Sequence, residues 1–211
     1  MCAARAGCPT SVTSTALRAV FPGLGLLSSK ASLTAASEAP IWRTITIGEY
    51  KGVNAVRTAF DASPCPIGLG ESADEILGRP AFLYAKKRTQ LDLTVVSVLD
   101  LGFGEDGATL QEIYARALQI GLELCPAEVG PILRLNYLDQ PVGEFLNIAM
   151  RPIARYDGEL VDLTVGNGGA GLLLIGGDGE PGLVLAGRIR FVFVRPRIGD
   201  QSLPDGELVK R

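Results

Sequence analysis

Histidine is absent from this chain of 211 residues. Its absence excludes Ser-His-Asp and Cys-His catalysis, general base catalysis by histidine and every metal site that needs a histidine ligand. Any catalysis has to use carboxylates, cysteine, lysine, tyrosine or a cofactor. Since no motif in the sequence requires a cofactor or a metal ion, we expect neither to be bound.

Cysteine and long apolar runs are also scarce. The four cysteines are Cys2, Cys8, Cys65 and Cys125, and no two of them form a C-x-x-C motif. This spacing disfavours a zinc site or a disulfide scaffold and agrees with a cytoplasmic location. No apolar run reaches the roughly 18 residues of a membrane-spanning helix. The net charge of −3 gives no overall attraction to nucleic acid or to anionic membranes.

Composition divides the chain into three parts. Residues 1–40 contain no acidic residue before Glu38 and are rich in Ala, Ser, Thr and Leu. We interpret them as a leader or a disordered tail, either from a misassigned start or, alternatively, as a targeting peptide. Residues 41–197 are long enough for one domain with its own core, and residues 198–211 form a polar tail.

Hydrophobic periodicity in residues 41–197 predicts short helices and strands. The predicted helices are 53–62, 73–77 with Ser72 as its N-cap, and 109–120. The predicted strands are 42–47, 82–84, 91–101, 132–137, 145–150, 160–165, 172–175, 183–185 and 188–194. Strands 132–137 and 145–150 are expected to form a hairpin. Because helices come early and strands late, we predict a single α+β domain, with a mainly antiparallel sheet and two to three helices on one face.

Two local signals are specific enough to interpret individually. Thr109 followed by Glu112 is a capping box, and Gly121 favours the end of the same helix. Residues 166–171 match the dinucleotide motif G-x-G-x-x-G, but the next glycines follow too soon for a helix. We therefore interpret 166–171 as a glycine-rich loop between strands.

The strongest candidate site is the segment that contains Cys125, Glu128, Arg134 and Tyr137. Cys125 and Glu128 lie in a proline-bounded turn, and Arg134 on the next predicted strand is suited to bind a carboxylate or a phosphate. Glu128 is the candidate catalytic base. In the purely structural interpretation, Cys125 is a small buried residue and Glu128 forms an ion pair with Arg134.

Arginines gather at the end of the domain, at positions 188, 190, 195 and 197. One interpretation is a stripe that contacts phosphates or nucleic acid. The other, which the acidic net charge favours, is an edge strand that its charges protect from aggregation.

Four stretches carry a resemblance to a known family: EILGRPAF (75–82), the run IYARA…GLELCPAEVGP…LRL-Y (113–137), GEFLNIAM-PI (143–153) and RFVFVRP (190–196). With these stretches the chain resembles a family of short, uncharacterised bacterial proteins. The resemblance implies a bacterial, cytosolic protein. Because the family has no established activity, it assigns no catalytic residue.

These observations favour a small binding or accessory protein that recognises a protein partner or a small ligand around residues 125–137. The alternative is a histidine-independent hydrolase or transferase, with Glu128 as the base and Arg134 as the anion anchor. Nucleic acid is the least favoured partner, since only the terminal arginines suggest it.

Overall fold

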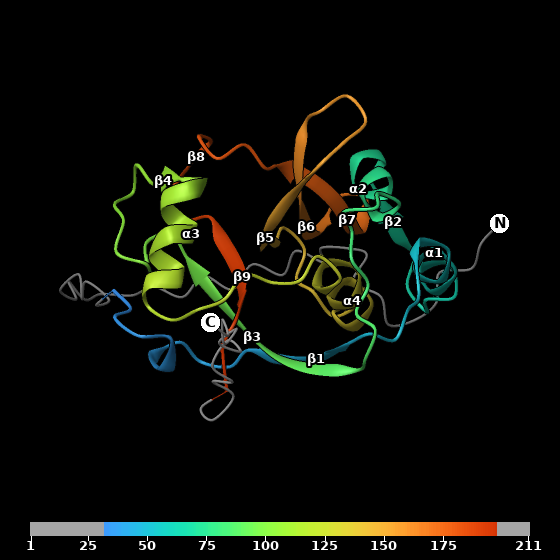
Figure 1. Ribbon diagram of the computed structural model, residues 1–211, viewed down its shortest axis with the longest axis horizontal. Coiled ribbons are helices and arrows are strands. Elements are labelled where there is room, and N and C mark those ends of the chain that lie inside the picture. The colour runs from blue at the N-terminus through green and yellow to red at the C-terminus, as the bar shows by residue number, and fades with distance from the viewer. Residues whose placement is uncertain (1–31, 198–211) are drawn as a thin grey trace, which may run out of the picture.

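A seven-stranded sheet lies at the centre of the computed structural model, which describes residues 32–197 (Figure 1). The strands, in their order across the sheet, are β1 (Arg43–Ile47), β3 (Thr89–Ser97), β9 (Arg190–Val194), β5 (Phe145–Ala154), β6 (Leu160–Gly168), β7 (Gly171–Asp178) and β2 (Ile67–Leu69). The pairs β5–β9 and β2–β7 are parallel, and the other neighbouring pairs are antiparallel. A separate small sheet pairs β4 (Ala108–Thr109) with β8 (Val184–Leu185).

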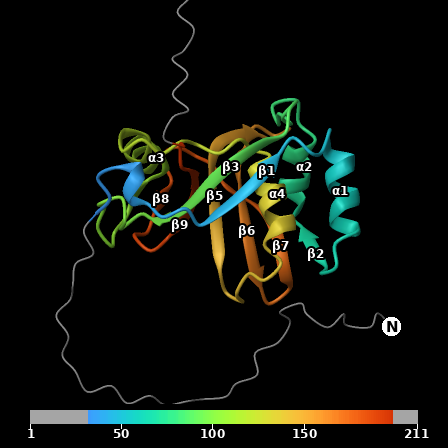
Figure 2. The same ribbon diagram turned by 90° about the horizontal axis from the view of Figure 1, so that it is seen from below.

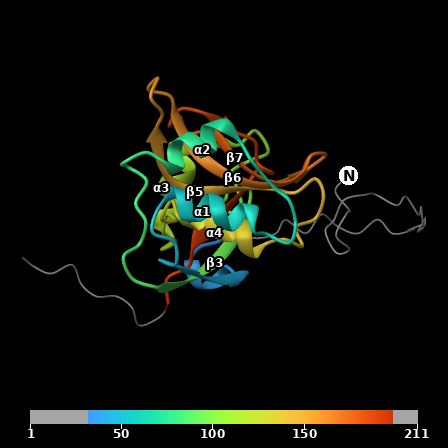
Figure 3. The ribbon, with the colours of Figure 1, turned by 90° about the vertical axis from the view of Figure 1, so that its right-hand side faces the viewer.

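Helices cover both faces of the sheet. α1 (Val53–Asp61), α2 (Glu71–Leu77) and α4 (Val129–Asn136) pack on one face (Figure 3), and α3 (Leu110–Gln119) packs on the other (Figure 2). Strand β9 supplies both cores, because its side chains alternate between the faces. Val192 and Val194 point to the three helices, whereas Phe191 and Phe193 point to α3. The predicted α+β class and mainly antiparallel sheet are confirmed; α3 on the second face is an addition.

The segment before residue 41 is partly packed on this domain. The 3-10 helix η1 (Ala36–Glu38) lies beside the end of α3, where the Ala36 N–H donates to Ile120 O at 2.6 Å. Ala39 is fully buried. The expected boundary at residue 40 therefore falls inside packed structure, and the expectations for residues 1–31 and 198–211 lie outside the described residues.

Helix α3 begins as its sequence predicts. The Thr109 hydroxyl accepts a hydrogen bond from the Glu112 N–H at 3.3 Å, and the Glu112 carboxylate accepts one from the Thr109 N–H at 2.9 Å. After the helix, Gly121 has φ +89°, the left-handed region that glycine adopts without strain. Both ends were visible in the sequence because they depend on local chemistry alone.

We expect Thr109→Ala to lower the free energy of unfolding by about 1 kcal/mol, because the Glu112 N–H loses its side-chain acceptor and the Glu112 carboxylate loses the hydroxyl that donates to it. Urea unfolding of the full chain measures this change. Thr58→Ala is the control: Thr58 lies on the exposed side of α1, and alanine there changes stability by less than about 0.5 kcal/mol. Equal losses in both variants would contradict a capping role for Thr109.

The predicted strand 132–137 is wrong, and so is its hairpin with 145–150. These residues belong to α4, and β5 pairs instead with β6 and β9. All residues from Val129 to Arg134 are buried, so this stretch has no exposed polar face that would mark it as a helix. Pro131 lies in the first turn, where its missing N–H is tolerated. The apparent alternation came from Arg134, whose Nη1 donates to Gly166 O, and from Asn136, whose Nδ2 donates to Ile132 O within the helix.

Three smaller predictions also need correction. Residues 82–84 do not form a strand, and Ser72 lies inside α2, whose N-cap is Gly70. The loop after α1 contains the short strand β2, which had not been predicted. Each of these features depends on contacts with distant segments rather than on local sequence.

The glycine-rich segment 166–171 joins two strands, but β6 continues through Gly168 and β7 starts at Gly171, so little of the segment is loop. The ring of Phe145 lies against Gly166, where a Cβ atom would be 2.5 Å from the ring. Gly166 is therefore needed for packing between neighbouring strands. The absence of a following helix removes the dinucleotide interpretation.

A membrane span was not expected from the sequence. Among residues 32–197, no helix has the length and apolar character to cross a bilayer.

Candidate functional site

The segment that joins α3 to α4 occupies the gap where β5 and β9 separate. Glu123 forms a bridge to Val194 of β9, and the Cys125 N–H donates to Ala149 O of β5 at 2.6 Å. The segment therefore hydrogen-bonds to both strands before α4 begins. This arrangement fixes the position of all four residues of the predicted site.

Glu128 is fully buried at the start of α4. Its two carboxylate oxygens accept hydrogen bonds from the backbone N–H groups of Gly48 at 2.9 Å and Ala85 at 2.8 Å. Gly48 has φ +84°, and a Cβ there would lie 2.2 Å from Lys87 O, so only glycine fits this approach. Burial and, after it, the Glu128 charge raise the pKa of Tyr84 to about 12. Glu128 thus joins two loops to α4.

Arg134 is fully buried near the other end of α4. Its Nη1 donates to Gln140 Oε1 at 2.5 Å and to Gly166 O at 2.9 Å, and its Nη2 donates to Tyr137 O. Burial lowers the pKa of Arg134 to about 10, so the side chain stays charged at neutral pH. Within residues 32–197, no ion pair joins Arg134 to Glu128, which differs from the expected structural pair.

Tyr137 is buried at the C-terminal end of α4. Its ring meets Trp42 edge-on, with centroids 5.1 Å apart, and the Arg43 guanidinium lies 4.3 Å from the ring centroid. Its hydroxyl donates to Glu144 Oε2 at 2.6 Å. Burial, followed by this hydrogen bond, raises the pKa of Tyr137 to about 12. Tyr137 is therefore held by an aromatic, a cation and a carboxylate.

Cys125 is a free, buried thiol. Its Sγ donates to Val192 O at 3.3 Å, and burial raises the pKa of the thiol well above its usual range. Because the thiolate is the nucleophilic form, Cys125 is unreactive at neutral pH.

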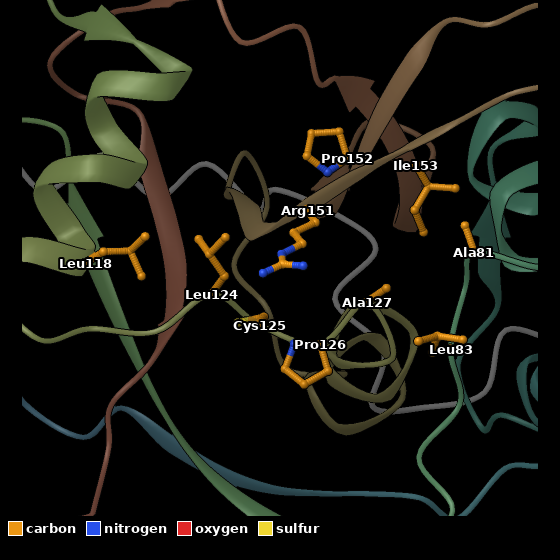
Figure 4. A pocket seen from close by; sticks show the side chains of 10 residues that line it. All are labelled: Ala81, Leu83, Leu118, Leu124, Cys125, Pro126, Ala127, Arg151, Pro152 and Ile153. Carbon is orange, nitrogen blue, oxygen red and sulfur yellow. The ribbon is translucent and has the colours of Figure 1, made fainter. Parts of the chain in front are cut away.

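A pocket of about 670 Å³ opens beside Cys125. Most of its lining is apolar and comes from the segment after α3, the end of α3, β5 and the loop after α2 (Figure 4). The lining residues are Ala81, Leu83, Leu118, Leu124, Cys125, Pro126, Ala127, Arg151, Pro152 and Ile153. Of the four predicted site residues, this pocket includes Cys125 and leaves Glu128, Arg134 and Tyr137 outside.

Arg151 reaches the pocket because β5 is irregular. Its pairing with β6 is regular up to Ile148 and resumes at Ile153, and the intervening residues form a bulge. Bulges redirect side chains and are common beside functional sites. The sequence contained a signal, since Arg151-Pro152 follows an apolar run and proline cannot donate to a sheet. Arg151 was nevertheless missed as a site residue.

Asp162 of β6 is a second residue that the sequence analysis missed. It is 4% exposed, and its Oδ1 has no hydrogen-bond partner among the described residues. Burial, and after it the charge of Asp178, raise the pKa of Asp162 to about 7. The Tyr114 hydroxyl, also buried and without a hydrogen-bond partner in this part of the chain, has its pKa raised by burial and then by Asp162. Within residues 32–197, no cluster of three potential ligands forms a metal site.

The terminal arginines are held by partners within the domain. Arg188 pairs with Glu105 at 3.3 Å, Arg190 with Glu144 at 3.1 Å and Arg197 with Asp92 at 2.8 Å. The Arg197 guanidinium, with Thr44 as the second cause, lowers the pKa of Asp92 to about 2. These pairs disfavour a phosphate-binding stripe. The edge-strand interpretation is wrong too, because β9 lies between β3 and β5.

Comparison with known proteins adds no relative from which a role could be transferred. The resemblance to short bacterial proteins therefore stays a prediction. No protein-family model, curated protein or solved structure matches the chain.

Proposed function

We propose that this protein is a binding protein that holds a small, largely apolar molecule in the pocket beside Cys125. The observation that carries the proposal is the pocket itself, whose volume of about 670 Å³ lies within the roughly 300–1,000 Å³ of small-molecule sites. Leu83 and Leu118 at the pocket are 74% and 49% exposed, so apolar surface there is available to a ligand.

The alternative of a hydrolase that uses Glu128 has less support. Both oxygens of Glu128 are occupied by backbone N–H groups, and the residue does not line the pocket. A general base has to reach the proton that it removes. Cys125 is poorly suited to nucleophilic attack, because its thiol is protonated and buried. Binding without catalysis agrees better with this lining.

The experiment is a thermal-shift titration of the full chain with 1-decanol and decanoate, kept below the concentrations at which they aggregate. A ligand at about 100 times its Kd adds roughly 2.7 kcal/mol, which raises the Tm by several degrees. Ala81→Trp, at an exposed position in the pocket lining, fills the pocket and abolishes the shift. Ala115→Trp, at an exposed position on α3 outside the lining, preserves it.

A rise in Tm that is lost in Ala81→Trp and kept in Ala115→Trp supports the proposal. No rise with either probe, or an equal rise in both variants, overturns it. After either outcome, the exposed leucines would be better explained as a contact surface for a protein partner.

A further inference from the structure

Among residues 32–197, one charged group lines the pocket. This group is the side chain of Arg151, and the other nine lining residues in this range are uncharged. Figure 4 shows Arg151 extending from β5, with its guanidinium directed towards the side of the pocket formed by Leu124, Cys125 and Pro126. A ligand in this pocket therefore meets an apolar wall and one cation.

This guanidinium is unpaired in the described part of the chain. No ion pair or hydrogen bond joins the Arg151 side chain to another residue within 32–197. Other arginines differ: Arg155 is bound by Glu75 and Glu159, and Arg134 by three oxygens. Arg151 is exposed, and in a chain with more acidic than basic residues a cation without an acidic partner beside an apolar pocket is available to an anionic ligand.

The surroundings of Arg151 keep it available. Glu128, which follows the lining residue Ala127, is held by Gly48 and Ala85 and lies outside the lining. Pro152 packs against Gly179, where an added Cβ atom would lie 2.7 Å from the Pro152 Cβ. This packing holds the bulge that contains Arg151 in place. A planar guanidinium with free N–H groups binds a carboxylate through two parallel hydrogen bonds.

We propose, on the basis of the binding function above, that the ligand of this pocket is an amphipathic carboxylate. Its carboxylate binds Arg151, and its hydrocarbon part lies on the leucines and on Ile153. Cys125 contributes apolar surface and no charge, because its thiol already donates to Val192 O. A cationic amphiphile is disfavoured by Arg151, and a small polar anion gains nothing from the apolar wall.

The experiment compares decanoate, 1-decanol and octanoate by calorimetry on the full chain at low salt. Arg151→Met keeps an unbranched side chain similar to the aliphatic part of arginine and removes the charge. It weakens decanoate binding about tenfold to a hundredfold, because a charged hydrogen-bonded contact is lost, and changes 1-decanol binding less than about twofold. Decanoate binds about fifteenfold more tightly than octanoate, since two more methylene groups are buried.

Arg188→Met is the matched control, because Arg188 is exposed and is not among the residues that line the pocket. It leaves decanoate affinity unchanged. The proposal fails if Arg151→Met weakens both ten-carbon ligands equally, or if decanoate and 1-decanol bind the native chain equally well. Those outcomes leave the binding function standing. Absence of binding by all three probes instead overturns the binding function.

Discussion

Glu128→Gln is expected to lower the free energy of unfolding by about 2–4 kcal/mol. Both carboxylate oxygens accept from buried backbone N–H groups, those of Gly48 and Ala85. Glutamine keeps one acceptor, but its amide NH2 then faces the second N–H, and two donors meet without an acceptor between them. Guanidinium unfolding measures the change as a lower midpoint at an unchanged m-value.

Glu123→Gln is the matched control for this substitution. Glu123 lies five residues earlier, and its side chain is exposed, so the change there stays within about 0.5 kcal/mol. Equal stability of the two variants would show that the buried N–H groups do not need the carboxylate. If Glu128 were the base of a hydrolase, Glu128→Gln would abolish turnover and leave stability unchanged. The measurement therefore also separates the structural role of Glu128 from the catalytic alternative.

The contrast between α3 and α4 explains how far the sequence predicted this fold. Helix α3 has a cap at Thr109, an apolar stripe and a terminal glycine, and all three features are local. Helix α4 packs against the sheet and α1, so most of its residues are buried and its apolar run is as compatible with a strand as with a helix. A buried arginine within it then imitates the alternation of a strand. Only the long-range contacts of Arg134 with β6 distinguish the two possibilities.

Of the four residues of the candidate site, Cys125 borders the pocket. The turn expected between Pro126 and Pro131 is only partly a turn, because α4 begins at Val129. The charged residue of that pocket, however, is Arg151, which comes from a strand 26 positions later. Reasoning from the sequence groups residues that are close along the chain. Which side chain enters the pocket depends instead on the bulge in β5. Glu128 and Arg134 were conspicuous because buried charges interrupt an apolar pattern, and in this fold they join loops.

The alternation in β6 likewise placed Asp162 on a face opposite Val161 and Leu163, where a polar residue normally meets solvent. In the folded chain Asp162 is buried, its pKa is about 7, and burial is the main cause. An unfolded chain releases this proton near pH 4. Between pH 4 and pH 7 the folded state therefore holds a proton that the unfolded state has lost, and stability falls as the pH rises.

Asp162→Asn is expected to remove this pH dependence. Because one pKa unit corresponds to about 1.4 kcal/mol, the native chain loses on the order of 2–3 kcal/mol between pH 5 and pH 8 through this residue, and the variant does not. Urea unfolding of both proteins at pH 5 and pH 8 gives the change in the free energy of unfolding between the two pH values. Subtracting the change in the variant from that in the native chain cancels the contributions of the other titrating groups. Asp157→Asn, at an exposed turn position, is the control and retains the native slope. If Asp162→Asn retains it as well, Asp162 is charged in the folded protein and its carboxylate has a partner. If the slope disappears, Asp162 holds its proton in the folded protein up to about pH 7, because burial disfavours the charged carboxylate, whereas a solvated aspartate releases its proton near pH 4.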